Sequence, residues 1–161
     1  FLKNYIPDEI KKIPKGVVVD QNGKQIGIHN GYIHYTIGQK RDLHLMDNRK
    51  VYVTNIDATQ NVITVNTKES LNHYHILIGN IHILNPHDIE KGTELHVNIR
   101  GYGLNPENPV VALEKQSDHI LLKLTSPAWA VAPGQPVVFY KNDLVLGGGI
   151  AEKSGSINNC G

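Results

Sequence analysis

The chain has little cysteine, no excess of one charge and no long apolar run. Its single cysteine, Cys160, excludes an intramolecular disulfide and a zinc site built on paired thiolates. Lys and Arg number 16 against 15 Asp and Glu, so the net charge of +1 neither indicates nor excludes a nucleic-acid partner. Without a signal peptide or the roughly 20 apolar residues that cross a bilayer, we expect a cytoplasmic protein that does not contact membranes.

The common catalytic motifs are also missing from the sequence. It contains no Gly-x-x-x-x-Gly-Lys-Ser/Thr, Gly-x-Gly-x-x-Gly, Gly-x-Ser-x-Gly or His-Glu-x-x-His. The neighbours of Cys160 offer no base that would activate its thiol. Gly147, Gly148 and Gly149 lie inside a strand pattern with no helix after them, which favours close backbone packing or a bulge over a phosphate site. We therefore predict no catalytic residue in this chain.

The nine histidines prompt the question of a metal site. In a strand, His73 and His75 would lie on the same side. A third clustered ligand is missing from the sequence around them, so we interpret the histidines as exposed or hydrogen-bonding and predict no metal site.

What the sequence does contain is a strand pattern. Short runs of β-branched and aliphatic residues recur about every ten residues between Gly, Asn, Asp and Pro, which predicts an all-β fold. Asp20-Gln21-Asn22-Gly23, Asn30-Gly31, Ser117-Asp118 and Tyr140-Lys141-Asn142-Asp143 are the expected turns. The expected strands are 16–20, 25–29, 32–36, 51–57, 61–66, 75–84, 93–100, 109–116, 119–125, 136–140 and 144–151.

A break near residues 79–92 divides this pattern into two small β units. We predict a first domain over 1–80, a second over 81–153 and a flexible tail over 154–161, because the tail is polar and rich in Gly and Ser. Residues 1–7 resemble the end of an amphipathic helix cut in the middle, so we expect the first domain to be truncated at its N-terminal end.

Two stretches are more specific than ordinary turns. In Gly27 to Leu43, a strand is followed by a Gly-hinged loop that presents Gln39, Lys40 and Arg41, residue types that suit contacts with phosphate and sugar. The alternative is a solvated loop that happens to be charged. In Ser126 to Tyr140, a Pro-Gly turn fixes Gln135 at the start of a strand, where its amide either contacts a polar ligand or only caps the loop.

Together these stretches resemble the bacterial tRNA-specific 2-thiouridylases of the MnmA family. The family's Gly-x-His-x-Gly and Tyr/His-Thr-Ile/Leu-Gly-Gln-Arg match Gly27 to Arg41. Its Ala-Val-x-Pro-Gly-Gln-x-x-Val-Phe-Tyr matches Ala130 to Tyr140, and its Leu-Gly-Gly-Gly-Ile matches Leu146 to Ile150. The order and spacing match as well, and the resemblance extends from Phe1 to about Lys153.

The resemblance implies a C-terminal fragment: a small central β domain followed by an elongation-factor-like β-barrel. The family's catalytic domain, which binds ATP with Mg and carries the active cysteines, would precede Phe1. A sulfur-donor protein supplies the persulfide with which the family makes 2-thiouridine at the wobble position of tRNA. The expected role of this chain is therefore tRNA binding, with no cofactor of its own and no activity alone.

The resemblance also assigns tRNA contacts in the barrel. The family uses an Arg-Tyr pair at the end of a strand and the Gln of Pro-Gly-Gln. These correspond to Arg100 and Gln135, but Gly101 stands where the family has Tyr, and Tyr102 follows one place later.

In the loop of the central domain, Lys40 replaces the family's Arg and is followed by Arg41. This preserves the positive charge and changes the geometry of the donors. We expect both residues to contact the tRNA backbone. Two other interpretations remain open: a stand-alone elongation-factor-like barrel that binds RNA, and a protein-interaction domain.

Overall fold

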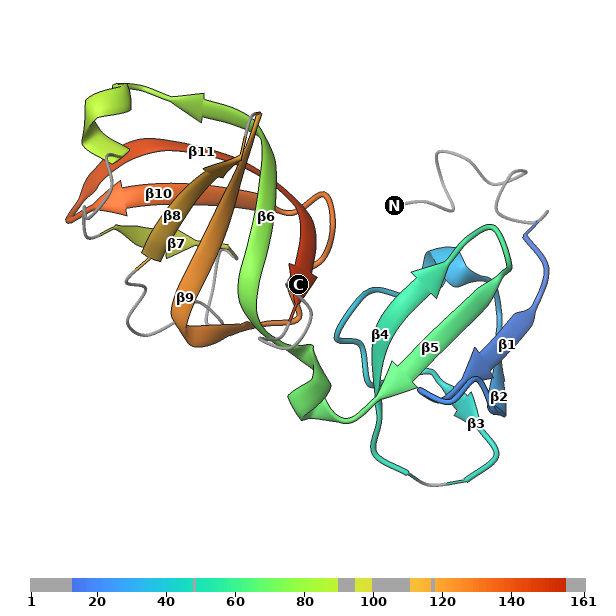
Figure 1. Cartoon of the computed structure of the whole chain (residues 1–161). Coiled ribbons are helices and arrows are strands. Elements are labelled where there is room, and N and C mark those ends of the chain that lie inside the picture. The colour runs from blue at the N-terminus through green and yellow to red at the C-terminus, as the bar shows by residue number, and fades with distance from the viewer. Residues whose placement is uncertain (1–12, 48, 90–94, 100–110, 117, 156–161) are drawn as a thin grey trace. The chain divides into compact units, whose positions relative to one another are not determined.

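The computed structural model describes residues 13–47, 49–89, 95–99, 111–116 and 118–155. These residues form two units, and each unit contains one β-sheet (Figure 1). The first unit ends at Leu71 and the second begins at Asn72. Apart from three short 3-10 turns, the regular structure of these residues is strand, so the all-β prediction is confirmed. None of their helical turns is long and apolar enough to cross a membrane.

The first unit is a five-stranded sheet with the order β3-β2-β1-β5-β4. β1 runs parallel to β5, and the other neighbours are antiparallel. The elements are β1 (Gly16–Val19), β2 (Gln25–His29), η1 (Tyr32–His34), β3 (His44–Leu45), β4 (Tyr52–Asp57), β5 (Val62–Asn66) and η2 (Lys68–Leu71). Alternate strand residues point into its core, which contains Val18, Ile26, Tyr35, Val53, Ile63 and Val65.

Asp20 closes the hairpin between β1 and β2. Its Oδ1 accepts hydrogen bonds from the backbone N–H groups of Asn22 at 2.9 Å and Lys24 at 3.0 Å. Gly23 has a φ of 77°, which glycine adopts without steric cost. The predicted turn at residues 20–23 is therefore confirmed.

The strand predicted over residues 32–36 is wrong. Gly31, with a φ of 109°, turns the chain out of β2 into η1, where the Tyr35 N–H donates to the Tyr32 carbonyl at 3.0 Å. The turn carries the Tyr35 side chain into the core, and the edge position beside β2 goes to β3. The sequence did not predict β3, whose two residues are too few to show a pattern.

The second unit is a six-stranded antiparallel sheet with the order β7-β10-β11-β6-β9-β8. Register shifts interrupt the pairing of β6 with both β9 and β11, and such shifts bend strands. The bent sheet curls over its core (Figure 1). Its elements are β6 (Asn72–Ile83), η3 (Pro86–Ile89), β7 (His96–Asn98), β8 (Val111–Gln116), β9 (His119–Trp129), β10 (Pro136–Lys141) and β11 (Leu144–Gly155).

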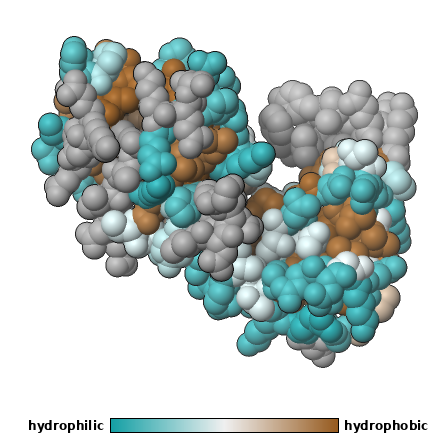
Figure 2. All heavy atoms as spheres, viewed as in Figure 1, coloured by the Kyte–Doolittle hydropathy of each residue, from teal (hydrophilic) through white to brown (hydrophobic). Residues whose placement is uncertain are grey.

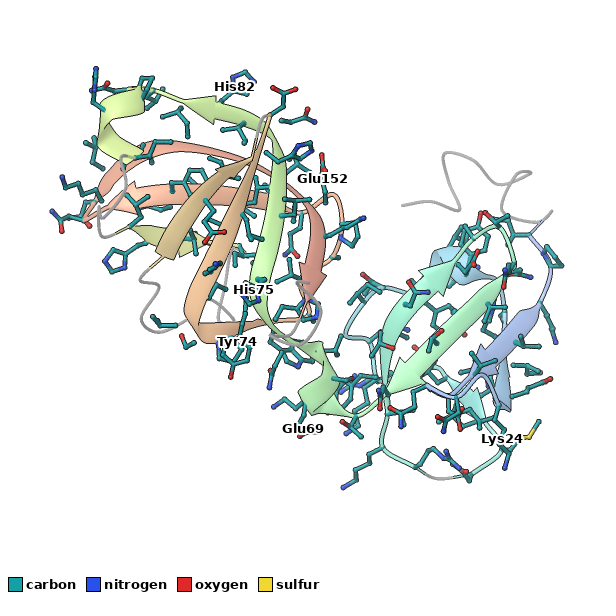
Figure 3. All side chains as sticks on the ribbon, in the orientation of Figure 1. Lys24, Glu69, Tyr74, His75, His82 and Glu152 are labelled. Atoms are coloured by element: carbon teal, nitrogen blue, oxygen red, sulfur yellow. The ribbon has the colours of Figure 1, made fainter. Side chains whose placement is uncertain are left out.

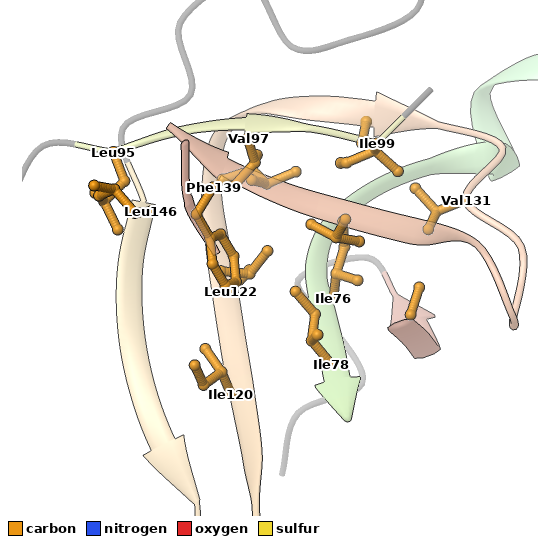
Figure 4. Close-up of a cluster of buried hydrophobic side chains, with 14 residues drawn as sticks. Ile76, Ile78, Leu95, Val97, Ile99, Ile120, Leu122, Val131, Phe139 and Leu146 are labelled. Carbon is orange, nitrogen blue, oxygen red and sulfur yellow. The ribbon is translucent and has the colours of Figure 1, made fainter. Parts of the chain in front are cut away.

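The core of the second unit is aliphatic and centred on Phe139, which is fully buried (Figure 4). Alternate residues supply it, such as Ile76 and Ile78 on β6 and Ile120 and Leu122 on β9. Fully burying a side chain of this size contributes about 1.5–3 kcal/mol. This core holds the Pro-Gly-Gln loop, which connects β9 to β10, on a rigid support.

Gly147, Gly148 and Gly149 allow the backbones of the second unit to approach one another closely. A Cβ at Gly148 would lie 2.5 Å from the carbonyl oxygen of Val137, and one at Gly149 would lie 2.7 Å from that of Gly79. The pairing register of β11 with β6 also shifts between Gly148 and Ile150. The prediction of close packing with a bulge is confirmed.

The predicted domain boundary and tail both need correction. The predicted break after residue 80 falls inside β6, which pairs with β9 on one side and β11 on the other, so the break lies between Leu71 and Asn72. Ser154 and Gly155, predicted as tail, pair with Ile76 and His75 at the end of β11. The rest of the predicted tail, 156–161, and the helix end expected at residues 1–7 lie outside the described residues.

Gly148→Ala should lower the free energy of unfolding of the second unit by about 1–3 kcal/mol, because the new methyl group meets the Val137 backbone. Urea unfolding followed by the fluorescence of Trp129, the single tryptophan, measures this. Lys141→Ala, at an exposed position of the same hairpin, should change the value by less than about 0.5 kcal/mol. Equal stabilities for the two variants would contradict the close approach.

Candidate functional site

The loop that carries Lys40 and Arg41 is attached to the outer edge of β4. The Gly38 N–H donates to the Val53 carbonyl at 2.8 Å, and the Val53 N–H donates to the Gln39 carbonyl at 2.9 Å. These two bonds continue the sheet beyond β4 and leave the next two residues projecting from a fixed backbone.

Gln39 closes this loop with its side chain. Its Oε1 accepts a hydrogen bond from the Thr36 N–H at 3.2 Å, and its Nε2 donates to the Arg41 carbonyl at 2.9 Å. Both ends of the amide are therefore used inside the loop. Gln39, grouped with the two cations in the sequence prediction, shapes the loop and leaves Lys40 and Arg41 as its charged outer face.

Lys40 and Arg41 are both exposed and form no ion pair with any residue that the structure describes. Nearby Arg49 differs, because its Nε donates to the two carboxylate oxygens of Asp47 at 2.7 and 2.8 Å. That hydrogen bond lowers the pKa of Asp47 and raises the pKa of Arg49. Hydrophilic residues gather over the connection between β3 and β4, which carries Arg49 (Figure 2). Two adjacent exposed cations without an ion pair among the described residues are suited to a polyanion.

A buried histidine, His29, lies at the end of β2, beside the start of this segment. Its Nδ1 accepts a hydrogen bond from the Gly31 N–H at 3.1 Å, so its Nε2 carries the proton and donates to the Asn61 carbonyl at 3.1 Å. The ring also packs edge-to-face on Tyr35, with the centroids 5.6 Å apart. Gly16 leaves room for the imidazole, since a Cβ there would lie 2.4 Å from Nε2. Sequence reasoning missed this role, although His29 stands in the Gly-x-His-x-Gly motif.

Gln135 holds the Pro-Gly-Gln loop of the second unit. Its Oε1 accepts a hydrogen bond from the Ala132 N–H at 3.1 Å, and its carbonyl accepts one from the Ala151 N–H at 2.8 Å. The Gly134 N–H donates to the Ala151 carbonyl, also at 2.8 Å. Gln135 therefore caps the loop, as one of the two interpretations predicted. Its half-buried side chain keeps Nε2 without a partner among the described residues, so that donor is available to a ligand.

The remaining predicted contacts, Arg100, Gly101 and Tyr102, lie outside the described residues. Lys40 and Arg41 share one loop of the first unit, whereas Gln135 belongs to the second unit.

His73 and His75 lie next to a register shift between β6 and β9. Their Nδ1 atoms are buried and unpaired among the described residues, and burial lowers the pKa of His73. Within the same part of the chain, no three His, Cys, Asp or Glu side chains gather as a metal site requires.

A histidine–carboxylate pair crosses the sheet of the second unit. His119 Nε2 on β9 lies 3.0 Å from Glu152 Oε2 on β11, and both side chains lie over Gly79 of the intervening β6. Figure 3 labels Glu152. A side chain at Gly79 would displace the carboxylate. The pair is well exposed, and such pairs contribute about 0–1 kcal/mol, so it links β9 to β11 across β6 but adds little to the stability of the sheet.

Two family models match the chain and together follow its two units. Residues 1–67 match the tRNA methyl transferase PRC-barrel domain, and residues 73–151 match the aminomethyltransferase beta-barrel domain. The junction between these matches falls where the structure divides, at Leu71 and Asn72.

Curated relatives match the chain along nearly its whole length. The tRNA-specific 2-thiouridylase MnmA 2 of Thermoanaerobacter sp. (strain X514) is 38% identical over 153 residues, which cover 95% of this chain and 41% of that protein. The MnmA proteins of Natranaerobius thermophilus and Pseudothermotoga lettingae are 36% and 34% identical, and the matches cover 96% and 94% of this chain. The matched regions are 40% and 42% of those two proteins, so the chain spans about two fifths of the length of these relatives.

His29→Ala should destabilise the first unit by about 2–4 kcal/mol, because the Gly31 N–H and the Asn61 carbonyl lose their partner and a cavity opens. Urea unfolding followed by amide NMR signals of residues 16–66 measures this. His34→Ala removes an exposed imidazole from the same unit and should have little effect. A loss no larger than that of His34→Ala would show that the buried imidazole is dispensable.

The second unit should become less stable as the pH falls from 7 to 5. Burial holds the pKa of His73 below its ordinary value of 6.5. As the pH falls, the unfolded chain therefore binds a proton at His73 before the folded unit does, which favours unfolding. His73→Gln should reduce this fall, and His82→Gln, at an exposed position of the same strand, should leave it unchanged. Urea unfolding at several pH values, followed by Trp129 fluorescence, tests this, and an undiminished pH dependence in His73→Gln would contradict it.

Proposed function

Because the chain belongs to the tRNA-specific 2-thiouridylase family, we propose that it is the part of such an enzyme that holds tRNA. The observation that carries the proposal is the match itself: relatives named as tRNA-specific enzymes cover 94–96% of the chain, across both units. Lys40 and Arg41, which share one exposed loop and form no ion pair with a described residue, support it. The descriptions of the two domain models mention methyl transfer, but these relatives, which match both units together, are named as thiouridylases.

In this proposal Lys40 and Arg41 bind the sugar-phosphate backbone of tRNA. Arg41 offers a planar fork of donors that suits two phosphate oxygens, and Lys40 offers a compact charge. Neither cation has to break an ion pair with a described residue before it meets a phosphate. Phosphate contacts of this kind position the RNA without reading its sequence.

Gln135 has a different role in the proposal. Its Oε1 is used by the loop, so its Nε2 donates to an acceptor on a ribose or a base edge. Arg100 and Tyr102, by their place in the sequence, add a phosphate contact and an aromatic contact to the same barrel. The carbonyl and amide bonds to Ala151 keep the loop fixed while the contact forms.

The chemistry of thiolation belongs to other parts of such an enzyme. The sequence has no glycine-rich phosphate loop for ATP and its Mg ion, and its only cysteine is Cys160. We assign ATP, Mg and the contact with a sulfur-donor protein to a catalytic domain outside this chain. The chain alone then binds unmodified tRNA in the cytoplasm and does not thiolate it.

Lys40→Ala with Arg41→Ala should weaken tRNA binding and reduce its salt dependence. Losing two phosphate contacts should make the negative slope of log affinity against log salt shallower by about 1.5. Fluorescence anisotropy with a labelled, unmodified tRNA bearing a wobble uridine measures both effects. Gln135→Ala should weaken binding by about threefold to tenfold and leave the slope unchanged, because it removes a neutral hydrogen bond.

The matched control is Lys15→Ala with Lys24→Ala, which removes two exposed cations from the same unit at other positions. If the control weakens binding as much as the loop variant does, net charge and not the loop determines affinity. If no form binds even at low salt, the chain does not hold tRNA, and a protein-interaction domain becomes the better interpretation.

A further inference from the structure

Tyr35 connects the loop that carries Lys40 and Arg41 to the core of the first unit. Its ring is buried to 9% exposure and packs against His29, and its hydroxyl donates to the Asp42 carbonyl at 2.9 Å. Asp42 directly follows Arg41 and has a φ of 62°, a left-handed conformation that few residues other than glycine adopt. Such a backbone persists where its surroundings hold it, and the Tyr35 hydroxyl is one of the groups that hold it.

Gln39 restrains the other side of the same segment. Its amide links the Thr36 N–H to the Arg41 carbonyl and so spans Lys40. The backbone bonds of Gly38 and Gln39 to Val53 fix the start of the segment on β4. Lys40 and Arg41 therefore lie between two fixed points, the edge of β4 and the carbonyl held by Tyr35.

We propose that Tyr35 and Gln39 are positioning residues that hold the backbone of Lys40 and Arg41 in the conformation that binds an RNA phosphate. This inference rests on the proposed function and extends it to two residues that do not touch the RNA. Ordering a loop upon binding lowers affinity, and a loop that is ordered beforehand avoids that loss. The fixed backbone thus makes Lys40 and Arg41 a preorganised anion-binding site.

Tyr35 and Gln39 also have a simpler possible role, which is to stabilise the first unit without affecting binding. The two roles differ in how the residues combine with the cations. If Tyr35 and Gln39 act through Lys40 and Arg41, their substitution has no further effect on binding once those cations are gone. A general loss of structure instead affects binding in either background.

The experiment is a double-mutant cycle on the whole chain with unmodified tRNA. Tyr35→Phe removes only the hydroxyl, and Gln39→Met keeps the side-chain length without its hydrogen bonds. Each is measured alone and together with Lys40→Ala and Arg41→Ala. Ser70→Ala is the matched control, because it also removes a side-chain bond to a backbone carbonyl, that of Thr67, elsewhere in the unit.

Tyr35→Phe and Gln39→Met should each weaken binding by about threefold to tenfold, which is the effect of ordering one or two groups upon binding. In the background without the two cations, the same substitutions should change affinity by less than about twofold. Amide hydrogen exchange of the free protein should become faster at Gly38 and Val53 in Gln39→Met, and should stay unchanged there in Ser70→Ala.

Full affinity in the folded Tyr35→Phe and Gln39→Met variants would overturn the inference and leave the proposed function standing, provided that loss of the two cations still weakens binding. Equal losses in both backgrounds would also overturn it and indicate a general structural role. If the wild-type chain does not bind tRNA, the proposed function fails and this inference fails with it.

Discussion

A buried imidazole with both ring nitrogens hydrogen-bonded is the interaction on which the first unit depends. His29 joins the Gly31 N–H to the Asn61 carbonyl, which lies 32 residues further along the chain. Asn61 in turn donates to the carbonyls of Pro14 and Lys15, so the same point fixes the chain before β1. Tyr35 packs on the ring and reaches Asp42 with its hydroxyl. The backbone next to the exposed cations Lys40 and Arg41 is thus connected to the core through Tyr35 and His29.

In the second unit, backbone contacts hold the loop that carries Gln135. Its strands approach closely because glycines at 147–149 leave room for carbonyl groups where a side chain would collide. In the Pro-Gly-Gln loop, the Gly134 N–H donates to the Ala151 carbonyl and the Ala151 N–H donates to the Gln135 carbonyl, while the Gln135 side chain closes the loop. Both units therefore hold a short loop with polar or charged residues against a hydrogen-bonded sheet, which is a common arrangement for binding residues.

Features with local causes were predictable from the sequence. The Asp20 turn, the strands with alternating apolar residues and the packing role of the three glycines follow from neighbouring residues. The short strand β3 and the turn η1 depend on which segment occupies the edge beside β2, and that choice is made by tertiary packing. The role of His29 and the internal bonds of Gln39 were missed because a sequence does not show which backbone groups will face a side chain.

The proposed function has tRNA bound on the loops at residues 36–42 and 132–135. Hydrogen–deuterium exchange of the chain with and without unmodified tRNA at low salt reports on each loop separately. We expect slower exchange in both loops when tRNA is present and little change at Asn142 and Asp143, the tip of the β10–β11 hairpin. If tRNA binds and exchange in both loops stays unchanged, the proposed binding site is wrong.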